Sequence, residues 1–288
     1  MNVAYRPQDL EPAARAVAIG TFDGVHRGHV RVLQAALATR LRPAVVTFDP
    51  HPRAVLGDGV PLLATLERRL ELLAGLGFGD VLVVPFDTAV AALPPEEFAD
   101  RILRAIGVEV VAAGDGFRFG HRREGDLDLL ERLGFDVRRV PLVDSVSSSH
   151  IRRLLAAGDI EHAAGLLGRP PELEGTVAIG DRRGKTLGFP TANLAVPEEL
   201  LVPKLGIYAG SALGTRAAIS IGTNPHFGGT ERRVEAFLLD YDGDLYGTRL
   251  VVELWQRLRD EAAFASEAEL VAAIDDDVAR TRAATRPS

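Results

Sequence analysis

The chain has 288 residues, of which 47% are hydrophobic, so we expect two domains of ordinary size that each bury their own core. Its formal net charge of −7 argues against a general nucleic-acid binder, and the absence of cysteine excludes disulfides, thiolate nucleophiles and Cys-ligated zinc. The start has no apolar core of a secretory signal and no apolar run reaches membrane-spanning length, so we expect a cytoplasmic protein that binds small molecules rather than nucleic acid or membrane.

Residues 1–168 alternate short apolar runs with helical patterns. Four apolar runs predict buried strands, at 16–22, 43–48, 80–86 and 108–114. The segments between them have helical periodicity, at 28–40, 61–77 and 94–107. Two more short helices are expected within 147–171. The alternation of strands and helices predicts a parallel sheet covered by helices on both faces.

After Pro171 glycine and proline become frequent and the patterns change to those of short strands. Five such strands are expected, at 175–180, 206–213, 215–222, 232–241 and 248–255. Ser266 and Glu269 form a capping-box pattern that opens a final helix over 266–284. The predicted fold is therefore α/β, with a parallel-sheet domain at 1–168 and an antiparallel β-barrel domain with a terminal helix at 169–288.

The stretch "GTFDGVHRGH", residues 20–29, lies between the first strand and the first helix. In open α/β sheets, ligands bind at this place, where the carboxyl end of a strand meets the amino terminus of a helix. Glycines let the backbone approach a phosphate closely, and His26 and His29 are three residues apart, so both imidazoles can face one ligand. They could then stabilise charge on phosphate oxygens in a transition state. The alternative is a glycine-rich turn with two surface histidines.

A second glycine-rich stretch, "GDRRGKTLGFPTAN", spans residues 180–193. Gly184, Lys185 and Thr186 match the end of the phosphate-binding pattern G-x-x-x-x-G-K-[ST], but the spacing from Gly180 is one residue short. A Leu-Gly-Phe-Pro segment comes next in place of a helix. The pattern therefore indicates either a damaged P-loop or a different way of binding ATP.

The first stretch matches the H-x-G-H signature of the α/β nucleotidyltransferases, whose fold is Rossmann-like. With "TFDPHP" (47–52), "FRFG" (117–120) and "SSSHIR" (147–152), it resembles the adenylyltransferase module of the bacterial bifunctional riboflavin kinase/FAD synthetase family. The resemblance implies that His26 and His29 contact the ATP phosphates and that Ser148, Ser149 and Arg152 clamp the triphosphate. It also implies nucleotide contacts at Gly20, Phe22, Gly24 and Gly28, and flavin contacts at Asp49, Phe117 and Phe119. The alternative for the serines is an ordinary helix N-cap.

The second stretch resembles the riboflavin kinase module of the same family, in which G-[RK]-x-LGFPTAN is highly specific. In that family a small β-barrel binds ATP without a P-loop. The resemblance implies that Thr191 and Asn193 hold magnesium and the nucleotide phosphates, and that Gly184 and Lys185 belong to a flap over those phosphates. Hydroxyl and amide oxygens are ligands that suit Mg²⁺.

Glu235 is the candidate catalytic base of the second domain. In "RRVEAFLLDY" strand alternation places it on one face with Phe237 and Leu239. A carboxylate buried beside apolar neighbours has a raised pKa, which suits removal of a proton from a hydroxyl. The family pattern implies the same role, and it implies a flavin contact at Arg259. The alternative is an exposed glutamate of an edge strand.

Together, the resemblances imply an enzyme that phosphorylates riboflavin to FMN in the barrel and then adenylylates FMN to FAD in the parallel-sheet domain, with Mg²⁺ and ATP in both steps. Gly116 and His150 depart from the family pattern, which has Asn or Asp at the first position and often Arg at the second. One alternative is therefore a riboflavin kinase with an inactive adenylyltransferase domain. Another is a flavin-binding protein without turnover.

Overall fold

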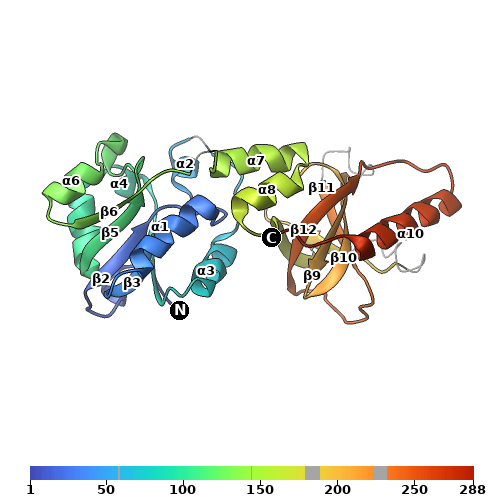
Figure 1. Ribbon diagram of the computed structural model, residues 1–288, viewed down its shortest axis with the longest axis horizontal. Coiled ribbons are helices and arrows are strands. Elements are labelled where there is room, and N and C mark those ends of the chain that lie inside the picture. Colours follow the sequence, from blue (N-terminus) through green and yellow to red (C-terminus); the bar gives the residue numbers. More distant parts are fainter. Residues whose placement is uncertain (58, 144, 179–188, 224–231) are drawn as a thin grey trace. The chain divides into compact units, whose positions relative to one another are not determined.

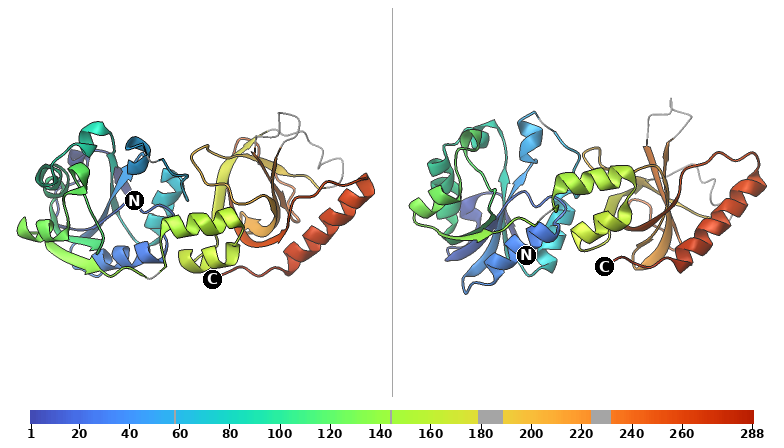
Figure 2. Two further views of the ribbon diagram at one scale, coloured as in Figure 1. Left: turned by 90° about the horizontal axis from the view of Figure 1, so that it is seen from above. Right: turned by 45° about the horizontal axis from the view of Figure 1, so that its top comes forward.

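The computed structural model describes the chain apart from residues 58, 144, 179–188 and 224–231 (Figures 1 and 2). The chain forms two compact units, Met1–Ser147 and Ser148–Ser288. The helices expected within 147–171 belong to the second unit, so the compact units divide earlier in the chain than the predicted functional boundary at 168/169. That functional boundary remains a prediction.

The first unit is built on a six-stranded parallel sheet in the order β1-β4-β3-β2-β5-β6 (Figure 1). Its strands are β1 Asn2–Ala4, β2 Arg15–Ile19, β3 Arg42–Asp49, β4 Asp80–Pro85, β5 Val108–Gly114 and β6 Asp136–Val140. Its α-helices are α1 Arg27–Leu37, α2 Pro52–Val55, α3 Leu66–Gly75, α4 Thr88–Ala91, α5 Pro95–Phe98 and α6 Leu127–Arg132. Shorter turns are η1 Pro7–Asp9, the π-helical η2 Ala99–Leu103, η3 Arg104–Ile106 and η4 His121–Arg123. The predicted parallel sheet is confirmed.

Two apolar layers cover the two faces of this sheet. Val17 and Ile19 of β2 pack with Phe98 on one face, and Ala18 between them packs with Leu33 of α1 and Leu73 of α3 on the other. Each fully buried Leu or Ile contributes about 1.5–3 kcal/mol to folding relative to an exposed one. Because both faces of the central strands are buried, their sequences are continuous apolar runs rather than alternating ones.

The order of the strands determines where a ligand can enter. From β2 the chain proceeds to β3 and β4 on one side, and β5 then pairs with the opposite side of β2. The connections that leave the carboxyl ends of β2 and β5 therefore diverge, and such a switch point is where open α/β sheets bind ligands. The first histidine motif comes directly after β2, and the "FRFG" segment comes after β5.

The second unit starts with two helices, α7 Ser148–Ala157 and α8 Ile160–Leu167, and continues as a closed antiparallel barrel in the order β10-β11-β8-β7-β12-β9. The strands are β7 Glu172–Ala178, β8 Ala192–Ala195, β9 Gly206–Ala212, β10 Thr215–Thr223, β11 Arg232–Leu238 and β12 Arg249–Arg259. The helix α10, Glu267–Ala283, packs against β9 and β10. Ser266 caps α10 by accepting a hydrogen bond from the backbone N–H of Glu269, as the sequence predicts. The predicted barrel and its terminal helix are confirmed.

The interior of the barrel is filled by apolar side chains. Along β11, Val234, Ala236 and Leu238 are buried, while the alternate residues Glu235 and Phe237 are half-buried on the opposite face. A small barrel of this kind has no room for a ligand inside. Polar side chains with a chemical role must therefore lie on its outer face, which Glu235 and Phe237 share with α10.

Candidate active sites

The turn between β2 and α1 brings the two predicted histidines together. His26 caps α1, and its Nδ1 accepts a hydrogen bond of 3.2 Å from the backbone N–H of His29. The two imidazole rings stack with centroids 3.5 Å apart, and Phe22 meets the His29 ring edge-on at 5.4 Å. Because Nδ1 of His26 accepts, a neutral imidazole carries its proton on Nε2. That nitrogen is then a hydrogen-bond donor.

The glycines of this turn are required by packing and by backbone conformation. A Cβ on Gly28 would lie 3.2 Å from two atoms of the His26 ring, and one on Gly20 would lie 3.3 Å from the Phe22 ring. Gly24 has a φ of +80°, in the left-handed region that favours glycine, and a Cβ there would lie 2.8 Å from Leu63. The contacts within the turn thus need these glycines whether or not a phosphate is bound.

Three of the sequence motifs meet at one edge of the sheet, because β3, β2 and β5 are neighbours. Asp49 ends β3, and Phe117 lies just beyond β5. The Phe117 ring is partly buried and stacks on Phe119 at 5.8 Å. Phe119 itself is 6% exposed and packs against Phe98 in the core. Its burial indicates a structural role, and the flavin contacts predicted for Asp49, Phe117 and Phe119 remain predictions.

Ser148, Ser149 and Arg152 lie on α7, in the second compact unit, whereas the two histidines lie in the first. Their joint action on one triphosphate therefore remains a prediction.

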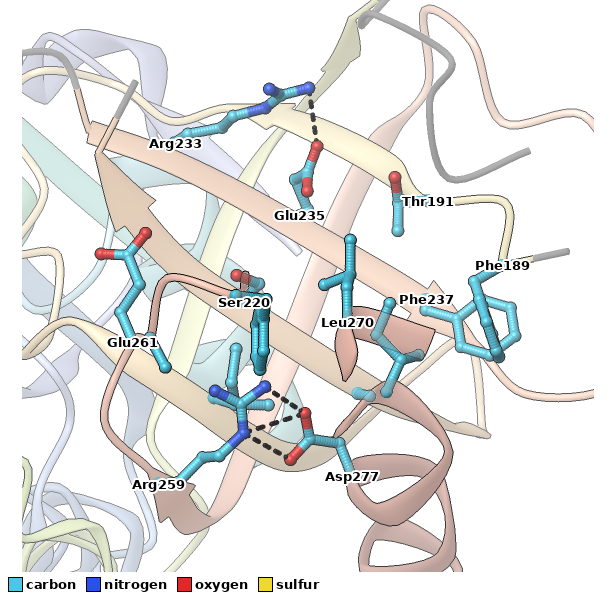
Figure 3. Close-up of a pocket in the computed structure, with 15 residues that line it drawn as sticks. Phe189, Thr191, Ser220, Arg233, Glu235, Phe237, Arg259, Glu261, Leu270 and Asp277 are labelled. Carbon is cyan, nitrogen blue, oxygen red and sulfur yellow. Dashed lines mark hydrogen bonds and ion pairs between the residues drawn. The ribbon is translucent and has the colours of Figure 1, made fainter. Parts of the chain in front are cut away.

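The second site is a cavity of about 330 Å³ on the outer face of the barrel, between the strands and α10 (Figure 3). Four residues named from the sequence line it: Thr191, Glu235, Phe237 and Arg259. Leu239 does not share this face, because β11 ends at Leu238 and Leu239 is buried elsewhere, so this part of the expected alternation is wrong.

Glu235 and Asn193 lie opposite each other on neighbouring strands, because β11 pairs with β8 in that register. Arg233 joins them. Its Nη2 lies 2.7 Å from Oε1 of Glu235 (Figure 3). Its Nε donates a 3.1 Å hydrogen bond to Oδ1 of Asn193. The Glu235 side chain is 26% exposed, so its surroundings are an ion pair at a pocket wall rather than the apolar burial expected from the sequence.

Arg259 is held in place by α10. Its Nε lies 3.0 and 3.2 Å from the two carboxylate oxygens of Asp277, and its Nη2 lies 2.6 Å from Oδ2 (Figure 3). The side chain of Asp277 is only 5% exposed, and the guanidinium also lies over the Phe264 ring at 5.6 Å. A buried bidentate pair of this kind fixes the orientation of an arginine at the pocket wall.

The oxygen donors in this pocket suit a metal that arrives with a nucleotide. Among the described residues no group of three or more His, Asp or Glu side chains could hold a metal ion alone. The hydroxyl of Thr191 and the amide oxygen of Asn193 are hard, neutral oxygen donors, and Mg²⁺ usually combines a few of these with phosphate oxygens and water. Asn193 Oδ1 already accepts one hydrogen bond and retains a second lone pair.

The secondary structure after Thr191 distinguishes the two alternatives for the second glycine-rich stretch. Gly184 and Lys185 lie outside the described residues. Thr191 leads directly into strand β8, whereas a P-loop leads into a helix that binds the phosphates with its amino terminus. In the described residues that follow the motif, the chain therefore continues as a strand rather than as the helix that follows a P-loop.

Three residues that sequence reasoning missed are Arg233, Asp277 and Arg69. Arg233 stands two positions before Glu235 in a strand, so the alternation rule already places the two on one face. Arg69 is the third residue after Leu66 and the fourth before Leu73, which puts a cation on the apolar face of α3. Nothing local to Asp277 indicates its partner.

Comparison with known proteins gives the same division along the chain. A family model described as FAD synthetase matches residues 8–152, and one described as riboflavin kinase matches residues 167–285. A protein of Listeria monocytogenes is 38% identical, over 93% of this chain and 92% of its own length. One of Pseudomonas fluorescens is 37% identical, over 100% and 99% respectively. Both are named bifunctional riboflavin kinase/FMN adenylyltransferase.

A solved structure shares the whole fold. It is a crystal structure from Streptococcus pneumoniae described as a macrolide-efflux protein, with a TM-score of 0.86 and 30% sequence identity over 97% of this chain and 98% of its own. In the part of this chain that the structure describes, no helix has both the length and the apolar character needed to cross a membrane.

Proposed function

The chain belongs to the family of bifunctional riboflavin kinase/FMN adenylyltransferases, and from this premise we propose how its two sites divide the two reactions. The enzyme phosphorylates riboflavin to FMN and adenylylates FMN to FAD, with ATP as the donor in both steps. We assign the kinase reaction to the barrel pocket and adenylyl transfer to the edge of the parallel sheet. We also place the protein in the cytoplasm, where ATP is abundant.

In the kinase reaction Glu235 removes the proton from the terminal ribityl hydroxyl of riboflavin. The hydroxyl oxygen attacks the γ-phosphorus of ATP, the bond to the β-γ bridging oxygen breaks, and ADP leaves. The observation that carries this assignment is the guanidinium of Arg233, which lines the cavity with the proposed base Glu235 and also bonds to the proposed metal ligand Asn193. Thr191 and Asn193 would hold Mg²⁺, which when bound neutralises charge on the phosphates. Arg259 orients the flavin.

In adenylyl transfer a phosphate oxygen of FMN attacks the α-phosphorus of ATP, and pyrophosphate leaves. This oxygen is already anionic, so the step needs no side-chain base. His26 and His29 donate hydrogen bonds to the phosphate oxygens as charge develops, together with the amino terminus of the 11-residue helix α1. Ser148, Ser149 and Arg152 bind the triphosphate by hydroxyl and guanidinium hydrogen bonds.

The direct test is to incubate the purified protein with riboflavin, ATP and Mg²⁺ and to separate the flavins over time. We expect FMN to appear first and FAD later, because FMN is the acceptor of the second step. FMN alone would show that the departures at Gly116 and His150 have inactivated the first domain. Unchanged riboflavin would show a binding protein without turnover.

We expect Asp277→Asn to raise the KM for riboflavin about tenfold, equivalent to about 1.4 kcal/mol. The neutral amide no longer fixes the Arg259 guanidinium, whose orientation depends on the bidentate pair. The KM for ATP should stay the same. Asp276→Asn is the matched control, because Asp276 lies on the same helix and its side chain is exposed. An unchanged riboflavin KM in Asp277→Asn would remove Arg259 from the flavin site.

A further inference from the structure

Arg69 of α3 is a buried cation beneath the proposed adenylyltransferase site. The residue is 2% exposed, and its guanidinium lies at the carboxyl ends of β2 and β3. Nη1 donates a 2.6 Å hydrogen bond to the carbonyl oxygen of Thr21 and one of 3.3 Å to that of Phe48. Nη2 lies 3.4 Å from Oδ1 of Asp49. One side chain therefore contacts the segments at the ends of two neighbouring strands.

Both segments are parts of the site. Thr21 lies between Gly20 and Phe22 in the histidine turn, and Asp49 belongs to the "TFDPHP" segment. A hydrogen bond of 3.2 Å from Oγ1 of Thr47 to the Thr21 carbonyl oxygen joins the same two segments. The position of the histidine turn relative to Asp49 thus depends on a small group of contacts, and Arg69 makes four of them, to Thr21, Thr47, Phe48 and Asp49.

The pairing of Arg69 is poorly suited to a purely stabilising role. Burial lowers the pKa of Arg69, and the charges of Asp23 and Asp49 act in the opposite direction. Within the described residues its Nε is buried and has no hydrogen-bond partner. Burial of a cation is costly unless its charge and its donors are fully compensated. Arg69 donates hydrogen bonds to carbonyl oxygens of the two site segments, and the two charges that compensate it, Asp23 and Asp49, belong to the same segments.

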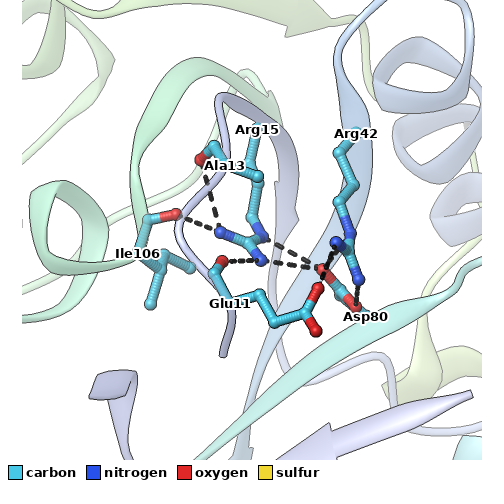
Figure 4. Close-up of polar contacts among 6 residues, drawn as sticks. All are labelled: Glu11, Ala13, Arg15, Arg42, Asp80 and Ile106. Atoms are coloured by element: carbon cyan, nitrogen blue, oxygen red, sulfur yellow. Dashed lines mark hydrogen bonds and ion pairs between the residues drawn. The ribbon is translucent and has the colours of Figure 1, made fainter. Parts of the chain in front are cut away.

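Arg15, at the other end of the same sheet, shows what a fully compensated arginine looks like (Figure 4). Its Nε and Nη2 both contact Oδ2 of the buried Asp80, at 3.1 and 3.0 Å. Its remaining donors reach the carbonyl oxygens of Ala13, Ile106 and Glu11. Arg15 opens β2, whereas the histidine turn begins after the last residue of that strand. It is therefore a buried cation of the same unit, remote from the site.

We propose that Arg69 is a positioning residue for adenylyl transfer. Its guanidinium fixes the histidine turn against the end of β3, so that His26, His29 and Asp49 face one ligand. It touches no reacting atom and acts through the backbone of the two segments. This proposal rests on the proposed location of adenylyl transfer at this edge of the sheet.

The test compares Arg69→Met and Arg69→Lys with Arg15→Lys in the full chain. Displacement of catalytic groups by about 1 Å can cost about 100-fold in rate. We therefore expect Arg69→Met to lower kcat for FMN-to-FAD conversion about 100-fold, with a smaller change in the KM for ATP. Arg69→Lys keeps the charge and some of the hydrogen bonds. Its kcat for FMN-to-FAD conversion should therefore be about tenfold higher than that of Arg69→Met. Riboflavin phosphorylation, measured in the same samples, should remain within twofold and shows that the second unit is folded, whereas the melting temperature reports on the first unit.

The kcat of Arg15→Lys for adenylyl transfer should stay within about twofold of that of the parent protein, even if the melting temperature of this variant is lower. The proposal is wrong if variants of Arg69 and Arg15 with the same fall in melting temperature lose the same share of the adenylyl-transfer rate. It is also wrong if the kcat of Arg69→Lys for adenylyl transfer is no higher than that of Arg69→Met. If Arg69→Met does not fold, the adenylyl-transfer rates of Arg69→Lys and Arg15→Lys are compared instead, and the rate of Arg69→Lys should be the lower of the two. His29→Ala separates the two proposals: full FAD formation in that variant would refute the site assignment itself, whatever the Arg69 variants do.

Discussion

Glu235→Gln is expected to abolish FMN formation from riboflavin and ATP and to leave the conversion of FMN to FAD unchanged. General-base catalysis contributes about 10²–10⁴-fold to a rate, so the kinase kcat should fall by a factor in that range. Glutamine keeps the shape of glutamate and an oxygen that accepts from Arg233, so the pocket contacts persist while the proton acceptor is lost. The measurement is the rate of each half-reaction, started from riboflavin and from FMN separately.

Glu253→Gln is the matched control. Glu253 lies on β12 of the same barrel and is ion-paired with Arg286 at 2.6 Å, but it does not line the pocket. Both substitutions remove one negative charge next to an arginine, at two different positions of the barrel. A kinase rate within tenfold of the parent in Glu235→Gln would place the base elsewhere. Loss of both reactions in a folded protein would refute the assignment of one reaction to each domain.

His29→Ala is expected to produce the reverse pattern, with FMN formed normally and FAD formation reduced about 10²–10³-fold, the usual effect of removing one donor to a developing charge. The backbone N–H of residue 29 still caps α1 through His26, so the turn keeps its hydrogen bond. The variant loses the imidazole, with its ring contacts to His26 and Phe22. The rates from riboflavin and from FMN again separate the two steps.

His162→Ala controls for the loss of an imidazole at a helix start. His162 lies on α8, its side chain is 79% exposed, and it pairs with Asp159. It should leave both reactions unchanged. FAD formation within tenfold of the parent in His29→Ala would mean that the stacked imidazoles do not stabilise the transition state.

Local patterns in the sequence predicted the central elements correctly. Most residues of the strands β2, β3, β4 and β5 are buried, so each strand contains a run of apolar residues that predicts it. The edge strands β1 and β6 were missed because they lack such a run: β1 has three residues, and three of the five residues of β6 are exposed. Strand β8 was not predicted either, because it has only four residues and the first two belong to the "LGFPTAN" motif.

The sequence by itself therefore determined the type of each domain and the family, and it predicts the residues with reactive side chains, since these depend on short-range periodicity and on contiguous motifs. Only the tertiary structure decided what holds those residues in place. Arg233 and Asn193 are 40 positions apart and meet through the register of β11 on β8. Arg259 meets Asp277 only because α10 packs against the barrel. Arg69 lies 48 positions from Thr21, whose carbonyl oxygen it contacts. Register and strand order are set by closure of the barrel and by the sum of core contacts, so no local pattern encodes which distant side chains will meet.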